Sequence, residues 1–279
     1  MNKALAEILL NHVDWVCAQQ DRFPNIVFMK FLRQAEEHFG KNEVGNLQEI
    51  ELQLCIRIWQ SKQVECIEAG RELVRIFQNI SERPEMALIK EELSKSIGGK
   101  PLMKHLLEKR GNKPGEKNVY VSILLNVEVQ RRLESMLFTL PEENAQWHLK
   151  WLLDFAGIEF GKESESILVD LVRYIVVNVT PHNDIIHSNI LQRHKMIGML
   201  ITQQKHKVHQ SWVLQALFID WLYYDGKSPD YIMLVEPGML LMYRSASQHP
   251  RMTDMLVEYL DNYIKTYDPS RVDEAYLSV

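Results

Sequence analysis

The sequence is poor in the residues that mark several protein classes. Only 12 glycines and 10 prolines occur among 279 residues, few for a turn-rich all-β protein. Three cysteines (Cys17, Cys55 and Cys66) contain no C-x-x-C motif, so disulfides and a thiolate zinc site are not expected and a reducing compartment fits better. No apolar run approaches the roughly 18 residues of a membrane span, so no membrane partner is expected.

Positive charge is also scarce. The formal net charge is −5, whereas a protein that binds nucleic acid by itself usually has a clear basic footprint. A nucleic-acid role would therefore be local or delegated to a partner. The glycine motifs of nucleotide sites and of hydrolase nucleophiles are absent, as is H-E-x-x-H. No catalytic residue, cofactor or metal is predicted.

Helical periodicity dominates what is present. Apolar residues recur at steps of three and four, for example at Leu47, Ile50, Leu54 and Ile58. The first 15 residues, MNKALAEILLNHVDW, are typical of an amphipathic helix rather than a secretory signal. Helices are predicted over 3–19, 25–39, 46–60, 62–80, 84–96, 100–110, 127–139, 142–157, 163–179, 185–203, 209–224, 230–246 and 251–265.

Prolines and one apolar run refine these elements. Ser228 and Pro229 suit the N-cap and the first position of a helix. Pro237 is expected to break 230–246 into two helices, because proline is costly in a helix interior. The run Val119–Leu125 is the one strand candidate, without an obvious partner strand.

The spacing of the helices suggests an architecture. Helices begin about every 20 residues, and pairs of them would repeat near the HEAT or armadillo period. We therefore predict an all-α fold of stacked helical hairpins that form a HEAT/armadillo-like superhelix. The predicted parts are a helical subdomain at 1–97, a basic connector rich in Gly, Pro and Lys at 98–125, and a second helical subdomain at 126–279.

The connector is the first candidate site. Between Gly98 and Asn118 the local charge is about +4, which would suit phosphate contacts. A solvated helix and loop is the alternative, since no aromatic side chain for base stacking occurs before Tyr120. The cations involved are Lys100, Lys104, Lys109, Arg110, Lys113 and Lys117.

Histidines are weaker candidates for a metal site, and cysteines are weaker candidates for a reactive thiol. His187 and His194 would share a face only on a continuous helix, and His206 and His209 straddle an expected helix break. Core packing is the expected role of Cys55 and Cys66, because free cysteine behaves as a small buried hydrophobe.

The stretch FIDWLYYDG, residues 218–226, places two carboxylates among aromatic residues. Helical spacing puts Asp220 at the edge of the core-facing stripe, free to bond a neighbouring helix. A packed helix end, a partner-contacting aromatic tip and a catalytic acid are the alternatives. Tyr223, Tyr224 and Tyr231 are the residues predicted to contact a partner.

Three long blocks resemble a known family. They are CIRIWQSKQVECIEAGRELVRIFQNISERPE (55–85), LVDLVRYIVVNVTPHNDIIHSNILQRHKMIGMLI (168–201) and ALFIDWLYYDGKSPDYIMLVEPGMLLMYRSASQHP (216–250). They are similar to the N-terminal region of the Integrator complex subunit 3 family, whose members also belong to the SOSS complex. The similarity covers about residues 46–275, and family members are much longer, so the chain looks like a fragment or a shortened relative.

The resemblance implies a helical superhelix and a function. It implies a non-catalytic nuclear scaffold that holds an OB-fold single-stranded-DNA-binding subunit and a small SOSS accessory subunit, with other Integrator subunits as further partners. Such complexes act in the DNA-damage response and in 3′-end processing of small nuclear RNAs. The scaffold would meet single-stranded DNA indirectly, through its OB-fold partner. Direct nucleic-acid binding through residues 100–117 and an all-α hydrolase are the rival hypotheses.

Overall fold

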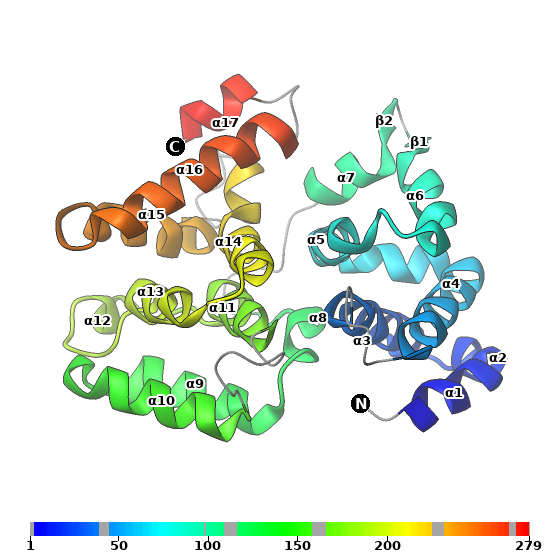
Figure 1. Cartoon of the computed structure of the whole chain (residues 1–279), viewed down its shortest axis with the longest axis horizontal. Helices are drawn as coiled ribbons and strands as arrows, with labels where there is room; N and C mark the ends of the chain where they lie inside the picture. Colours follow the sequence, from blue (N-terminus) through cyan, green and yellow to red (C-terminus); the bar gives the residue numbers. More distant parts are fainter. Residues whose placement is uncertain are drawn as a thin grey trace. The chain divides into compact units, whose positions relative to one another are not determined.

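The chain is mainly α-helical in the residues that its computed structural model describes, which are 3–38, 45–97, 99–108, 116–157, 166–224, 232–267 and 272–278. It divides into two compact units, Met1–Gly111 and Asn112–Val279 (Figure 1). The strands in the described part are the two-residue β1 and β2, which pair in antiparallel register. The prediction of an all-α fold is confirmed.

The first unit carries seven helices and the β pair in its described residues. Their bounds are α1 Lys3–Asn11, α2 Val13–Ala18, α3 Phe23–Glu37, α4 Leu47–Cys66, α5 Arg71–Ile80, α6 Ala87–Ser94, β1 Ser96–Ile97, β2 Lys100–Pro101 and α7 Leu102–Glu108. The predicted helix over 3–19 is thus two helices, α1 and α2, which meet at His12.

The core of the first unit lies between α3 and α4, which pack along each other. Phe28 and Leu32 of α3 and Trp59 of α4 are fully buried there. The boundary predicted between 60 and 62 is instead a kink at Lys62 inside α4. The true break comes at Gly70, whose φ of +57° is a left-handed conformation that glycine adopts without a steric penalty.

The second unit carries the remaining helices. Their bounds are α8 Val119–Ser122, α9 Val127–Thr139, α10 Ala145–Phe155, α11 Ile167–Asn178, α12 Asn183–Ile186, α13 Arg193–Gln203, α14 Lys207–Leu222, α15 Ile232–Gln248, α16 Pro250–Tyr267 and α17 Val272–Ser278. The helix predicted over 185–203 is therefore two helices, so His187 and His194 do not share a continuous helix.

Helix α11 is the centre of the second unit. Each side chain from Leu168 to Val176 is buried, and α11 contacts α8, α13, α14 and α15. Helix α14 is buried from Trp212 to Leu222 and contacts α15, α16 and α17. Among the described residues, none of the helices has both the length and the apolar composition needed to span a bilayer.

The strand predicted at Val119–Leu125 is wrong, because its first four residues form α8. Asn118 caps this helix: its side-chain oxygen accepts hydrogen bonds from the backbone N–H groups of Tyr120 (2.9 Å) and Val121 (3.3 Å). Such a cap satisfies donors that have no partner inside the first helical turn. Burial of Tyr120 and Val121 against the unit then outweighs the β propensity of the run.

The break predicted at Pro237 is also wrong, since α15 continues through it. Proline provides no N–H group for the carbonyl four residues earlier, that of Met233. Arg193 of α13 replaces this donor, with its Nη2 atom 3.1 Å from the Met233 oxygen and 2.6 Å from a Glu236 carboxylate oxygen. A side chain from a neighbouring helix therefore satisfies the carbonyl that proline leaves without a partner.

Candidate functional site

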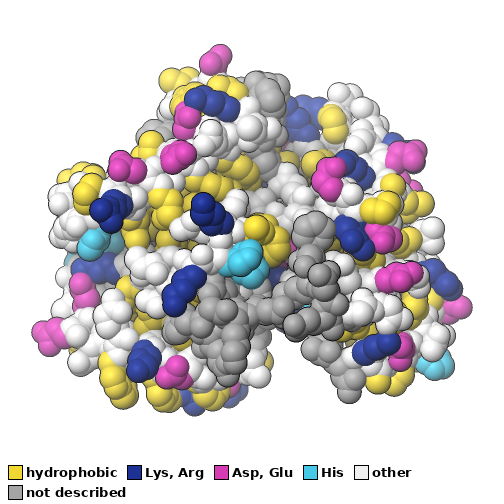
Figure 2. Space-filling model, viewed as in Figure 1, with side chains coloured by type: hydrophobic (Ala, Val, Ile, Leu, Met, Phe, Trp, Pro, Cys, Tyr) yellow, Lys and Arg dark blue, Asp and Glu magenta, His cyan; other side chains and the backbone are white. Residues whose placement is uncertain are grey.

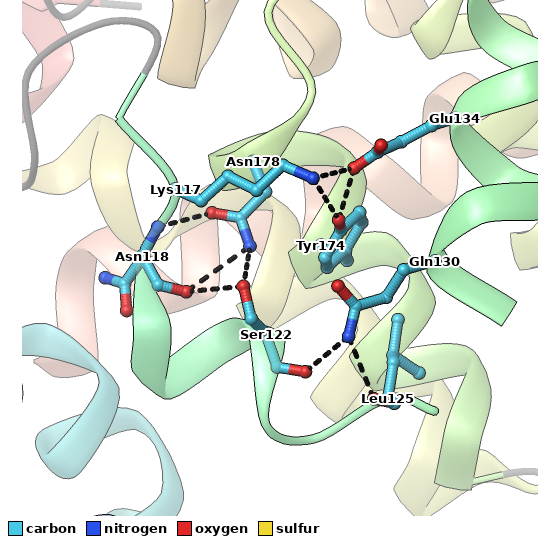
Figure 3. Close-up of polar contacts among 8 residues, drawn as sticks. All are labelled: Lys117, Asn118, Ser122, Leu125, Gln130, Glu134, Tyr174 and Asn178. Atoms are coloured by element: carbon cyan, nitrogen blue, oxygen red, sulfur yellow. Dashed lines mark hydrogen bonds and ion pairs between the residues drawn. The ribbon is translucent and has the colours of Figure 1, made fainter. Parts of the chain in front are cut away.

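A polar network joins the start of the second unit to two of its helices (Figure 3). The Lys117 amine lies 2.5 Å from a carboxylate oxygen of Glu134 on α9 and 3.3 Å from the hydroxyl of Tyr174 on α11. The Tyr174 hydroxyl donates to the same Glu134 oxygen. Through these contacts, Glu134 and Tyr174 hold Lys117, the residue before the α8 cap, against α9 and α11.

The second half of this network surrounds the α8 cap. The Asn118 backbone N–H donates to the Asn178 side-chain oxygen at 2.7 Å, and the Asn178 amide donates to the Ser122 hydroxyl at 3.0 Å. Gln130 of α9 donates to the backbone oxygens of Ser122 (2.8 Å) and Leu125 (3.0 Å), as Figure 3 shows. Side chains from α9 and α11 thereby satisfy backbone groups at both ends of α8.

The Tyr174 hydroxyl is held in its protonated form by this network. Burial and the Glu134 carboxylate raise the pKa of Tyr174 well above its usual range, so its hydroxyl stays protonated. The Tyr174 hydroxyl donates its hydrogen bond to Glu134, and the Lys117 amine lies within hydrogen-bond distance of both groups. These contacts tie α8 to α9 and α11 within the second unit.

The cations of the predicted phosphate patch are described in part. Lys100 at the start of β2 lies 3.0 Å from Glu108, and Lys117 is paired with Glu134. Lys104 is half-buried in α7 and also has an interaction partner. The other three, Lys109, Arg110 and Lys113, lie outside the described residues. Basic and acidic side chains alternate over the described part of the face seen in Figure 2. Phosphate contact by this segment stays a prediction.

The end of α14 is a packed helix end. Arg173 of α11 donates from Nη1 to an Asp220 carboxylate oxygen at 2.5 Å and to the Ala216 backbone oxygen at 3.2 Å. Both charged side chains are buried. The expectation that Asp220 bonds a neighbouring helix is confirmed, and the ion pair holds the carboxylate inside the core.

The tyrosines predicted to contact a partner lie at and beyond this helix end. Tyr223 ends α14 and is buried, and Tyr224 is half-buried with its backbone N–H bonded to the Trp221 oxygen. Tyr231 lies outside the described residues. A role for these tyrosines in partner binding stays a prediction.

The candidate cysteines and two of the candidate histidines, His194 and His209, are buried, whereas His187 and His206 are exposed. Cys55 and Cys66 are buried on α4, where burial raises the pKa of both thiols. His194 of α13 is buried, and desolvation together with nearby cations lowers its pKa to about 4. The described residues contain no group of three or more His, Cys, Asp or Glu side chains placed to hold a metal ion.

One exposed feature was not identified from the sequence. A row on α10 is formed by Trp147, Trp151 and Phe155. The exposed fractions of these residues are 65%, 45% and 44%, respectively. The Arg132 guanidinium of α9 lies 4.0 Å from the centre of the Trp151 ring and 3.8 Å from that of Phe155. The signal was present in WHLKWLLDF, because the aromatic residues recur every four positions on the face opposite the buried leucines.

Fold and polar contacts together define the class: an α-helical protein whose buried charges join helices within each compact unit. The comparison with protein families is specific. The sequence model described as Integrator complex subunit 3 N-terminal matches residues 1–279, and the chain belongs to this family. The match includes residues 1–45, beyond the 46–275 over which the sequence blocks carry the resemblance.

Curated relatives agree with this assignment. The chain is 28% identical to mouse Integrator complex subunit 3 over 272 residues, which are 96% of this chain and 25% of that protein. It is 30% identical to the Anopheles gambiae homolog over 277 residues, or 97% of this chain and 24% of the relative. The Dictyostelium discoideum homolog is 27% identical over 296 residues, which cover 98% of this chain and 18% of the relative. The chain thus spans about a quarter or less of the length of these relatives.

Proposed function

We propose that this chain is a helical scaffold segment of an Integrator complex subunit 3 protein. In this role it holds an OB-fold single-stranded-DNA-binding subunit and a small accessory subunit, and it meets single-stranded DNA through the OB-fold partner. The complex acts in the nucleus, in the DNA-damage response and in 3′-end processing of small nuclear RNAs. The observation that carries the proposal is the family match over residues 1–279.

The architecture supports a scaffold role. Neighbouring helices pack as pairs within each unit, for example α3 with α4 and α15 with α16. Stacking of such pairs into a HEAT/armadillo-like superhelix is part of this proposal, because superhelices of this kind present extended binding surfaces. Buried arginines in both units, such as Arg71 and Arg173, bind groups on neighbouring helices.

A calorimetric titration of the full chain with the purified OB-fold subunit tests this role. A scaffold is expected to bind with a dissociation constant of micromolar or tighter, the range of specific interfaces of standard size. Tyr224→Ala is expected to weaken binding if the end of α14 contributes, while Tyr243→Ala, at an exposed tyrosine of α15, serves as its control. No heat of binding from a folded chain would contradict the proposal.

Direct nucleic-acid binding through residues 100–117 is tested separately. A labelled single strand should bind with an affinity that falls steeply with salt, because phosphate contacts release counterions. Substitution of Lys100, Lys104 and Lys117 by Glu should abolish that binding. Binding that is absent or independent of salt would leave the OB-fold partner as the sole route to nucleic acid.

A further inference from the structure

The aromatic row on α10 is built as a fixed, exposed surface. Its three side chains recur every four residues, so they span about 12 Å of helix and stay within about 80° of its circumference. The Arg132 guanidinium lies between the rings of Trp151 and Phe155, and its Nε atom donates to Glu128 at 3.0 Å. Trp147 packs edge-on against His148. Cation–π and edge contacts therefore set the ring orientations without covering the outer faces.

The charged residues beside the row indicate which kind of partner could bind it. Lys150 and Asp154 are exposed, and helical geometry places both on the same flank of the row, about 40° apart. If a second α10 lies antiparallel across the row, the two flanks of the same kind face each other. Lys150 of each copy then faces Asp154 of the other, while Trp151 meets Trp151 and Trp147 meets Phe155.

We propose that this row, Trp147, Trp151 and Phe155, is a two-fold interface with a second copy of this chain. Such an interface must be self-complementary, with each contact made twice. The row meets this condition in both its aromatic residues and its flanking charges. A partner of one charge sign has less to recognise, because the flank carries both signs.

The available area sets the strength of this dimer. From their exposed fractions, the three side chains offer roughly 230–390 Å² per copy, given about 150–250 Å² for a buried aromatic residue. With the flanking residues, the total burial is about 1,000 Å², at the low end of specific interfaces. The dimer is therefore expected to be weak and to form at high protein concentration.

Sedimentation velocity of the full chain over a concentration series tests the dimer. The weight-average mass is expected to rise from 32.8 kDa toward twice that value as concentration increases. Trp151→Glu places two carboxylates at the two-fold axis and should keep the protein monomeric. Tyr243→Glu, at a tyrosine of α15 that is 73% exposed, is the matched control and should dimerise like the wild type.

A charge exchange separates this interface from general stickiness. Lys150→Glu alone should weaken dimerisation at least about tenfold, because it sets like charges against each other twice. Lys150→Glu combined with Asp154→Lys restores the opposite-charge pairs and should recover most of the affinity. All variants are checked for an unchanged melting temperature. A wild type that stays monomeric at millimolar concentration, equal effects of Trp151→Glu and Tyr243→Glu, or no recovery in the double variant would each overturn the proposal.

Discussion

The two units bury charge in different ways. In the first unit, the ion pairs of Arg33 with Glu36 and of Arg75 with Glu72 each lie within one helix, while Arg71 of α5 donates to the Leu107 backbone oxygen of α7. In the second unit, Arg173 and Arg193 each reach other helices and bind both a carboxylate and a backbone oxygen there. A pair within a helix adds little to tertiary structure, whereas an arginine that bridges helices fixes how they pack. We infer that the ion pairs of Arg173 and Arg193 contribute more to helix packing than those of Arg33 and Arg75.

The two units also differ in where their glycines lie relative to the helices. The described glycines of the first unit with positive φ, Gly45, Gly70 and Gly99, lie outside the α-helices. In the second unit, Gly157 also has a positive φ outside the α-helices, but Gly198 of α13 and Gly238 of α15 are inside helices and face side chains of neighbouring helices. An added Cβ would lie 3.0 Å from Leu241 at the first position and 3.1 Å from Phe218 at the second. These glycines permit a close approach of helices rather than a turn.

The largest expected effect is at Arg193. Arg193→Met leaves Glu236 without its partner and removes the donor to the Met233 oxygen, so unfolding should become easier by about 3–5 kcal/mol. Denaturant titration measures this loss. Arg251→Met, at an exposed arginine of α16, is the control and should change stability by less than about 0.5 kcal/mol.

A double-mutant cycle with Pro237 identifies the mechanism at Arg193. Pro237→Ala restores a backbone N–H that can reach the Met233 oxygen. The substitution should therefore help the Arg193→Met variant more than the wild type, by about 1 kcal/mol, the value of one hydrogen bond. Additive effects would show that Arg193 does not replace the donor that proline lacks.

The next largest effect is a dependence of stability on pH, which arises from His194 in the second unit. The folded pKa of His194 is about 4, below its ordinary value of 6.5, so the unfolded chain takes up this proton first as pH falls. The contribution of His194 to the free energy of unfolding is complete above about pH 6.5 and decreases as the pH falls toward 4. At pH 5 this decrease amounts to about 2 kcal/mol. His194→Leu should remove this part of the slope, while His182→Leu at an exposed histidine should keep it. A slope that is the same in both variants would refute the assignment.

A smaller effect is expected for the ion pair of α5 in the first unit. Arg75 is fully buried, and within the described part of the chain its Nε atom bonds Glu72 while its two Nη atoms have no hydrogen-bond partner. Replacement of the pair by Glu72→Gln and Arg75→Met should therefore change the free energy of unfolding by no more than about 1 kcal/mol. A loss above about 3 kcal/mol, comparable with Arg193→Met, would erase the contrast between the two units.

The smallest effect is expected for Gly238→Ala. The new methyl group would press on the Phe218 ring, which costs about 1–3 kcal/mol, but alanine recovers about 1 kcal/mol of helix propensity. A net loss near 1 kcal/mol in thermal unfolding is the expected result. In a Phe218→Leu background the contact is relieved and Gly238→Ala should become neutral or stabilising. A loss that persists there would point to another cause.

Sequence patterns predicted the elements that depend on local spacing. The period of Leu47, Ile50, Leu54 and Ile58 marks α4, and the stripe that ends in FIDWL marks α14, including the role of Asp220. Helix continuity at Pro237 could not be predicted, since it depends on a side chain 44 positions earlier in the chain, Arg193. The row on α10 escaped prediction because apolar periodicity identifies the buried stripe of a helix and does not distinguish an aromatic row on the opposite face.

The scaffold role depends most directly on whether a defined complex forms. Size-exclusion chromatography with light scattering of the full chain mixed with the OB-fold subunit measures the mass of that complex. The proposal predicts one peak whose mass is the sum of the subunits in a fixed ratio, kept on dilution to micromolar concentration. Two separate peaks at the masses of the free proteins, with the chain folded by circular dichroism, would contradict it.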